Sequence, residues 1–293
     1  MLVRQKLVLA LLSYADRPLP AITLMKLAFL LRNETGVAET SAFYDFVPYK
    51  YGPFSFALYR ELSSLSKDGY LMHEADTVSL LPKTRSLVEG KTGELPQDVR
   101  VASVLVLRKY GVMPQRELLK CVYERYPWYA TKSVLKDLIP ANLPESPKAP
   151  PAVYSMGYEA RSVDSFFDTL LRRGLRQIVD VRANPVSRKY GFASSTLAAV
   201  AAKLGLRYVH FPELGIPSAN RASLSDLASY QKLLSIYAAT TLLAEAHRVT
   251  ELGKHISCSP SVLVCMERDV RYCHRGPLAR ALAESTGLGV VHL

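Results

Sequence analysis

The chain has 293 residues, of which 49% are hydrophobic and 22% charged, and its formal net charge at neutral pH is +11. This balance is typical of a folded globular protein and excludes an intrinsically disordered chain. The sequence contains no apolar run of the roughly 18 residues that a bilayer requires, and the short apolar stretch near the N-terminus lacks a signal-peptide cleavage site. We therefore expect a cytoplasmic protein without a membrane partner.

The four cysteines, Cys121, Cys258, Cys265 and Cys273, form no C-x-x-C pair and are too few for a disulfide framework in a chain of this length. We expect a reducing compartment, no metal ion and no cofactor. The positive charge suits a polyanion, because neutralising phosphates releases counterions. Nucleic acid is the expected partner, DNA before RNA; the alternative is that the charge only aids solubility.

In the N-terminal half, the helical spacing of apolar residues predicts helices over residues 2–14, 22–33, 54–67, 97–110 and 114–125. Residues 70–81 have the pattern of two short strands around a turn. Helices followed by such a hairpin are typical of a winged helix-turn-helix. We expect residues 1–139 to form a mostly helical domain of this kind.

Four short motifs in this half carry a family resemblance. They are Leu24-Met-Lys-Leu27, Tyr51-Gly-Pro53, Leu58-Tyr-x-Glu-Leu62 and Asp68-Gly-Tyr-Leu71. On these motifs, residues 5–90 resemble the SocA-like (Panacea) domain. In a DNA-binding role the helix over residues 54–67 would enter the major groove, with Lys50, Arg60 and Lys67 as candidate contacts. The alternative is a winged helix that serves protein contact, for example in a homodimer.

Residues 140–151 include five prolines in twelve positions. Because proline fixes φ and lacks a backbone N–H, this segment is expected to be an extended, semi-rigid linker. It predicts a domain boundary, with a second domain over residues 152–293.

The second half alternates predicted strands with predicted helices. The strands are expected at residues 153–156, 178–181, 208–211, 262–266 and 290–293, and the helices at 163–173, 195–204, 224–252 and 276–286. This alternation indicates parallel βαβ units. We expect an α/β domain with a Rossmann-like open parallel sheet covered on both faces.

Ligands of such sheets bind at the carboxyl ends of the strands, where this sequence has many charged and aromatic residues. Arginines and a helix N-terminus favour phosphate binding, and acidic residues or a histidine can transfer protons. The alternatives are ion pairs that hold the loops together, and a structural cysteine in place of a thiolate nucleophile. The catalytic candidates are Asp180, Glu267, Cys273 and His274; the substrate- and phosphate-binding candidates are Tyr158, Glu159, Arg161, Arg182, Ser187, Tyr272 and Arg275.

Five motifs on the same residues resemble the family called domain of unknown function 488. They are Gly157-Tyr-Glu-Ala-Arg161, Asp180-Val-Arg182 with Pro185 and Ser187, Tyr208-x-x-x-Pro-x-Leu-Gly215, Cys265-x-Glu267 and Cys273-His-Arg275. One departure is Ala160, where glycine is expected. The resemblance spans residues 154–293 and implies a Rossmann-like domain whose motifs converge on one site, without a settled reaction.

The leading functional hypothesis is a nucleic-acid-binding hydrolase that cleaves a glycosidic or a phosphodiester bond, with Asp180 or Glu267 activating water. A cysteine-phosphatase loop is excluded, because the position six residues after Cys273 is Ala279 and not arginine. The alternatives are a non-catalytic DNA-binding regulator that senses a nucleotide or another phosphorylated ligand, and a cysteine-dependent transferase.

Overall fold

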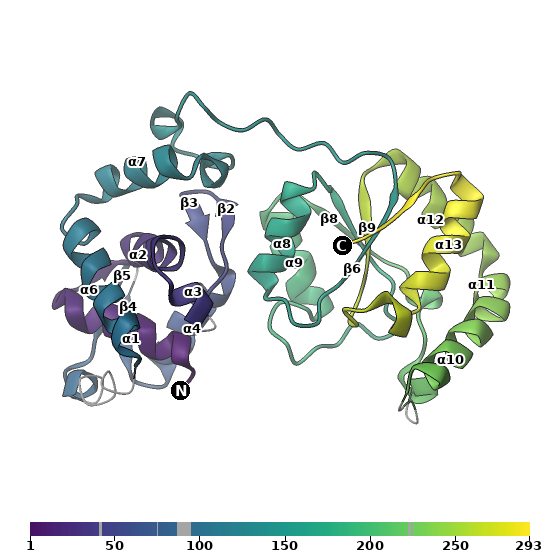
Figure 1. Ribbon diagram of the computed structural model, residues 1–293, viewed down its shortest axis with the longest axis horizontal. Helices are drawn as coiled ribbons and strands as arrows, with labels where there is room; N and C mark the ends of the chain where they lie inside the picture. Colours follow the sequence, from purple (N-terminus) through teal and green to yellow (C-terminus); the bar gives the residue numbers. More distant parts are fainter. Residues whose placement is uncertain (41–42, 75, 87–94, 222–223, 225) are drawn as a thin grey trace. The chain divides into compact units, whose positions relative to one another are not determined.

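The computed structural model divides the chain between Glu145 and Ser146 into two units (Figure 1). This division lies within the proline-rich segment, where residues 139–152 form neither helix nor strand. The structure describes residues 1–40, 43–74, 76–86, 95–221, 224 and 226–293. No helix within these residues combines the length and apolar character that a membrane span needs.

The first unit consists of helices around two small antiparallel sheets. Strands β1, β5 and β4 form one sheet in that order, and β2 and β3 form a separate hairpin. The hairpin expected within residues 70–81 is present as β4 and β5. The bounds are α1 (Val3–Ala15), β1 (Leu19–Pro20), α2 (Ala21–Glu34), α3 (Val37–Thr40), β2 (Val47–Tyr49), β3 (Gly52–Phe54), α4 (Phe56–Lys67), β4 (Leu71–Glu74), β5 (Thr77–Leu80), α6 (Gln97–Tyr110), α7 (Gln115–Arg125), η1 (Pro127–Ala130) and η2 (Lys136–Leu138).

The β2–β3 hairpin was not expected from the sequence. Its tight turn requires Gly52, whose φ of 87° favours glycine and whose missing side chain leaves room for the Tyr123 ring. Because residues 52–54 belong to a strand, α4 begins at Phe56 and not at residue 54. Ser55 caps this helix by accepting a hydrogen bond from the Leu58 N–H at 3.2 Å.

Two charged residues of the N-terminal motifs are buried and hold the helices of this unit in place. Lys26 on α2 is 2% exposed, and its Nζ donates to the Pro53 carbonyl at 2.8 Å. Glu61 on α4 accepts hydrogen bonds from Arg4 on α1 and, at 2.6 Å, from the Tyr44 hydroxyl. These contacts give the motif residues a structural role in positioning α4.

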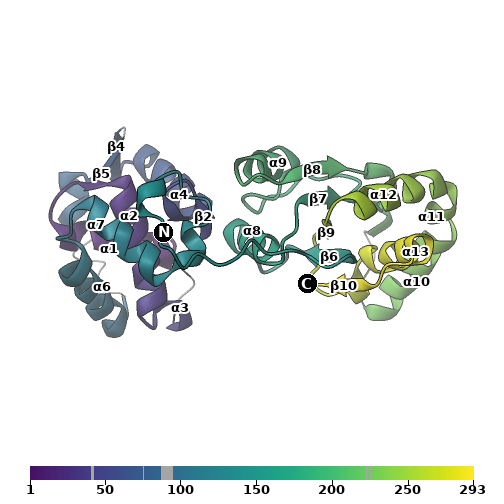
Figure 2. The same ribbon diagram turned by 90° about the horizontal axis from the view of Figure 1, so that it is seen from above.

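The second unit is built on a five-stranded sheet with strand order β10-β6-β9-β7-β8, in which every pairing is parallel. This confirms the expected parallel α/β sheet. Helices α8 and α9 lie on one side of it and α10 to α13 on the other (Figures 1 and 2). The bounds are β6 (Val153–Gly157), α8 (Val163–Arg172), β7 (Gln177–Asp180), α9 (Ser194–Lys203), β8 (Arg207–His210), η3 (Pro212–Leu214), η4 (Ser218–Arg221), α10 (Leu227–Ala239), α11 (Thr241–Ala244), α12 (Ala246–Cys258), β9 (Ser261–Cys265), η5 (Val270–Tyr272), α13 (Arg275–Thr286) and β10 (Val290–His292).

The helix expected over residues 224–252 is three helices. It is interrupted at Thr240, with φ −117° and ψ −69°, and at Glu245, with φ −98° and ψ 26°. Thr240 and Thr241 are both β-branched residues, which lower helix propensity, and apolar spacing alone does not reveal such breaks.

Burial of Lys26 makes the stability of the first unit dependent on pH. Burial lowers the pKa of Lys26 from 10.5 to about 7. Between these values the unfolded chain binds more protons than the folded chain, so the free energy of unfolding rises with pH, by up to about 1.4 kcal/mol per pH unit. Replacing this lysine with methionine (Lys26→Met) should remove this rise of the free energy of unfolding with pH. Urea unfolding at pH 7 and pH 9, followed by fluorescence of the sole tryptophan, Trp128, measures it.

The matched control is Lys67→Met, because Lys67 is exposed at the end of α4. This variant should keep the pH dependence of the wild type. Equal pH dependence in wild type and Lys26→Met would contradict the assignment.

Candidate functional site

The chain connections of the second unit leave the neighbouring strands β6 and β9 in opposite directions across the sheet. Strand β6 leads through α8 to β7, and β9 leads through α13 to β10. Helix α8, which follows β6, and α13, which follows β9, lie on opposite sides of the sheet (Figures 1 and 2). Such a topological switch point is where open α/β sheets bind ligands. The loops that follow β6 and β9 at their carboxyl ends therefore form the candidate site, which we call the switch-point rim (residues 157–161 and 266–272).

The two loops of the switch-point rim are in direct backbone contact. The Tyr158 N–H donates to the Cys265 carbonyl at 3.2 Å, and the Glu159 N–H donates to the Met266 carbonyl at 2.8 Å. A side chain at Gly157 would lie 1.8 Å from the Glu267 carbonyl oxygen, so only glycine fits there. Ala160 has a φ of 57°, in the left-handed region, which explains why glycine is expected at this position.

Two of the three arginines of the switch-point rim, Arg161 and Arg268, are close enough for their charges to repel each other. Arg161 is half-buried and Arg268 is exposed, and neither side chain forms an ion pair within the described residues. Burial and the positive charge of Arg268 lower the pKa of Arg161. The nearby Glu159 carboxylate instead accepts from the backbone N–H of Arg268 at 2.9 Å. Uncompensated guanidinium groups in one place favour binding of an anion such as phosphate.

Asp180 and Arg182, at the end of β7, form a buried ion pair. Arg182 Nε lies 2.8 Å from one Asp180 oxygen and Nη2 lies 2.5 Å from the other. The remaining Nη1 donates to the Phe192 carbonyl at 2.8 Å and to the Tyr158 hydroxyl at 3.2 Å. Burial would lower the pKa of Arg182, but the hydrogen bond and negative charge of Asp180 raise it. The Arg182 guanidinium therefore donates to groups of the protein itself and links the segments that carry Tyr158, Asp180 and Phe192.

Cys265, Cys273 and His274 form a second buried group beneath the rim, and each is 1% exposed. His274 Nδ1 lies 3.8 Å from the Cys265 sulfur and 4.0 Å from the Cys273 sulfur. The Cys273 sulfur also accepts from Arg275 Nε at 3.1 Å. Burial would raise the pKa of Cys273, but contacts with Cys265, His274 and Arg275 lower it well below its usual value.

The predicted site residues thus separate into a buried set and an open set. Tyr158 stacks on Phe192 with ring centroids 4.3 Å apart, and so belongs with the buried residues. The Ser187 hydroxyl accepts from the Lys189 N–H at 3.1 Å and Tyr272 packs edge-on against Tyr230, so both side chains contact residues outside the two rim loops. The buried set is Tyr158, Asp180, Arg182, Cys273, His274 and Arg275; the set that keeps solvent exposure is Glu159, Arg161, Ser187, Glu267 and Tyr272.

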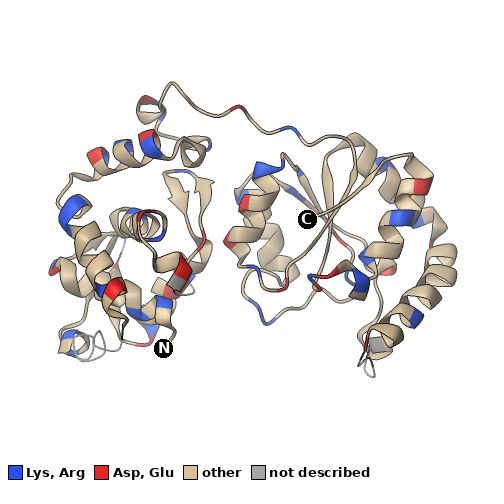
Figure 3. Ribbon diagram, viewed as in Figure 1, with Lys and Arg blue, Asp and Glu red and all other residues tan. Residues whose placement is uncertain are grey.

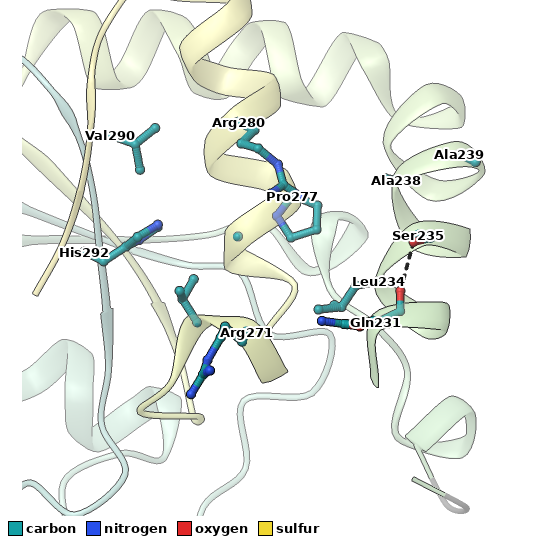
Figure 4. A pocket seen from close by; sticks show the side chains of 12 residues that line it. Gln231, Leu234, Ser235, Ala238, Ala239, Arg271, Pro277, Arg280, Val290 and His292 are labelled. Carbon is teal, nitrogen blue, oxygen red and sulfur yellow. Dashed lines mark hydrogen bonds between the residues drawn. The ribbon is translucent and has the colours of Figure 1, made fainter. Parts of the chain in front are cut away.

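A cavity of about 960 Å³ adjoins the η5 end of the switch-point rim, between α10, η5, α13 and β10 (Figure 4). Its lining includes Arg271, Arg280 and His292, and among the described residues that line it none is acidic. Arg271 is paired with Asp269 at 2.6 Å. Sequence reasoning missed this cavity because four separate elements supply its walls; the only signal was a cluster of basic residues in the last 25 positions.

Lysines and arginines are spread over both units (Figure 3). The predicted nucleic-acid contacts of the first unit are all exposed. Arg60 and Lys67 lie on α4, whereas Lys50 lies in the turn between β2 and β3.

Comparison with known families gives one match in this unit. Residues 162–282 match the family model of a domain of unknown function, DUF488. The matched segment begins after the Gly157–Arg161 loop and contains the remaining four motifs. No curated protein and no solved structure matches the chain. The match supports the resemblance of the second unit and assigns no reaction.

Removal of the buried Arg182 charge should destabilise the second unit strongly. Replacement of Arg182 with methionine leaves the Asp180 carboxylate buried without its partner, which costs about 3–5 kcal/mol. Chemical denaturation followed by circular dichroism measures this loss.

The control is Arg172→Met, which breaks the exposed pair with Asp168 on α8. Its effect should stay below about 1 kcal/mol. Similar losses in the two variants would contradict a structural role for the buried pair.

Proposed function

We propose that the protein binds nucleic acid and that its second unit hydrolyses it, at a glycosidic or a phosphodiester bond. The proposal rests on two rim arginines, Arg161 on the loop after β6 and Arg268 on the loop after β9. Glu267 lies next to Arg268 on the second of these loops. The guanidinium groups would hold a phosphate of the backbone. The acidic residue would then lie beside the bound strand.

Glu267 is the best remaining candidate for the general base, because it is the predicted catalytic residue that keeps solvent exposure. The Cys265 thiol donates to its Oε2 at 3.1 Å. The hydrogen bond with Cys273 and burial raise the pKa of Cys265 well above its usual value, so this thiol keeps its proton and donates the hydrogen bond to Glu267. Glu267 would take a proton from water as the water oxygen attacks the phosphorus or the anomeric carbon. The bond from that atom to the leaving oxygen or base nitrogen breaks, and the leaving group takes a proton from solvent.

The first unit would add DNA binding as a SocA-like winged helix. The element order α1, β1, α2, α4, β4 and β5, with the sheet order β1-β5-β4, supports this proposal. Exposed Arg60 and Lys67 on α4 would face phosphates or bases in the major groove. Lys50, in the hairpin turn, would contact the backbone.

Replacing the proposed base with its neutral isostere tests the hydrolase. Glu267→Gln should lower the cleavage rate of a labelled oligonucleotide by 100-fold or more, on the order of what a general base contributes, while binding survives. Gel analysis of single- and double-stranded DNA and RNA measures cleavage. The control is Glu284→Gln, because Glu284 is exposed near the end of α13, and this variant should cleave like the wild type.

The basic cavity favours a second candidate function, a regulator whose second unit senses a nucleotide or another phosphorylated ligand. Arg280 and His292 line it, and His292 Nδ1 lies 2.7 Å from the Ser155 hydroxyl, which Arg275 also contacts at 3.3 Å. This chain of contacts would link a ligand in the cavity to the buried residues beneath the rim. Unchanged oligonucleotides with every variant, together with a melting temperature raised by a nucleotide, would contradict the hydrolase and favour the sensor.

A further inference from the structure

Two sulfur atoms and one imidazole nitrogen converge beneath the switch-point rim. Cys265 ends β9, and Cys273 and His274 immediately precede α13. The two Sγ atoms and His274 Nδ1 all lie within 4.8 Å of one another. The ligands come from the end of a strand and the start of a helix, so their spacing in the sequence, C-x7-C-H, did not indicate a metal site.

The hydrogen bond of the histidine prepares its other nitrogen for coordination. His274 Nε2 lies 2.8 Å from the Val181 carbonyl oxygen, which can only accept. Nε2 therefore carries the proton, and the Nδ1 lone pair faces the two sulfurs. A carbonyl that fixes the tautomer in this way is the usual outer contact of a metal-bound histidine.

The spacing of the three atoms fits a tetrahedral zinc ion. Bonds of about 2.3 Å to sulfur and about 2.0 Å to nitrogen set sulfur and nitrogen ligands about 3.5 Å apart. The observed separations are 3.8 and 4.0 Å, so small side-chain movements would bring the ligands to bonding distance.

The electrostatic surroundings also suit two thiolates around a cation. Arg275 Nε donates to the Cys273 sulfur at 3.1 Å and stabilises its negative charge. The Glu267 carboxylate, 3.1 Å from the Cys265 sulfur, adds a second anionic group at the more exposed side. A set of two cysteines and one histidine leaves the fourth position of zinc to water.

We propose that Cys265, Cys273 and His274 bind one zinc ion that cross-links the end of β9 to the start of α13. Two zinc–sulfur bonds and one zinc–nitrogen bond replace bonds from the ion to water, and the thiol protons pass to solvent. The ion would hold the loop that carries Glu267 and Arg268 in place. This zinc site does not depend on nucleic-acid hydrolysis. With zinc bound, the Cys265 thiolate would no longer donate to Glu267, and the nearby cation would stabilise that carboxylate instead.

Titration of the reduced, metal-free full chain with cobalt(II), a spectroscopic substitute for zinc, tests the site. We expect thiolate-to-cobalt charge-transfer bands and intense visible bands that saturate at one equivalent and disappear when zinc is added. Cys265→Ser and Cys273→Ser should each weaken cobalt binding by at least 100-fold. The control variants Cys121→Ser and Cys258→Ser, at the other two cysteines, should bind like the wild type.

A second measurement on the wild type guards against variants that fail to fold. Bound zinc should protect Cys265 and Cys273 from alkylation, while the exposed Cys258 reacts at the same rate with and without zinc. The proposal is overturned if the reduced wild type gives no charge-transfer bands, or if zinc leaves the alkylation of both buried cysteines unchanged. A two-dalton mass loss that joins these cysteines in the protein as purified, without metal uptake after reduction, would instead assign a disulfide.

Discussion

The buried guanidinium of Arg275 holds three segments of the second unit together. It donates to the Glu267 carbonyl at 2.5 Å, to the Cys273 sulfur at 3.1 Å and to the Ser155 hydroxyl at 3.3 Å. A buried cation without a negative partner is strongly destabilising, and the positive charge of Arg275 helps to lower the pKa of the adjacent Cys273. The loop after β9, the start of α13 and strand β6 depend on this one side chain for their relative positions.

The close contact of the two rim loops has a chemical consequence. Gly157 lies against the Glu267 backbone. The loops that follow β6 and β9 therefore bring the positive charges of Arg161 and Arg268 close enough to repel each other. A bound anion would relieve this repulsion. The arginines that pair within the protein, such as Arg182, instead provide the rigid base beneath the open rim.

The sequence predicted the parallel sheet because central strands such as β6 and β9 are short, mostly apolar runs bounded by turn residues; β6, for example, ends at Gly157. The sequence could not show which charged side chains are exposed and which are buried. Arg161 and Arg182 stand in similar motifs, and only the folded structure shows that Arg182 pairs with the Asp180 carboxylate. The β2–β3 hairpin was missed because its strands are three residues long. The buried sulfur and imidazole group was missed because its ligands meet only across the β9–α13 loop.

The salt dependence of nucleic-acid binding tests the central claim, that the switch-point rim binds phosphate, most directly. Replacing both Arg161 and Arg268 with glutamine should lower the slope of log affinity against log salt by about 1.4–1.8, because each lost phosphate contact removes about 0.7–0.9. A control with glutamine at Arg173 and Arg207, two exposed arginines at the opposite edge of the sheet, should keep the wild-type slope. An unchanged slope in the rim variant, or the same decrease in the control, would contradict the account.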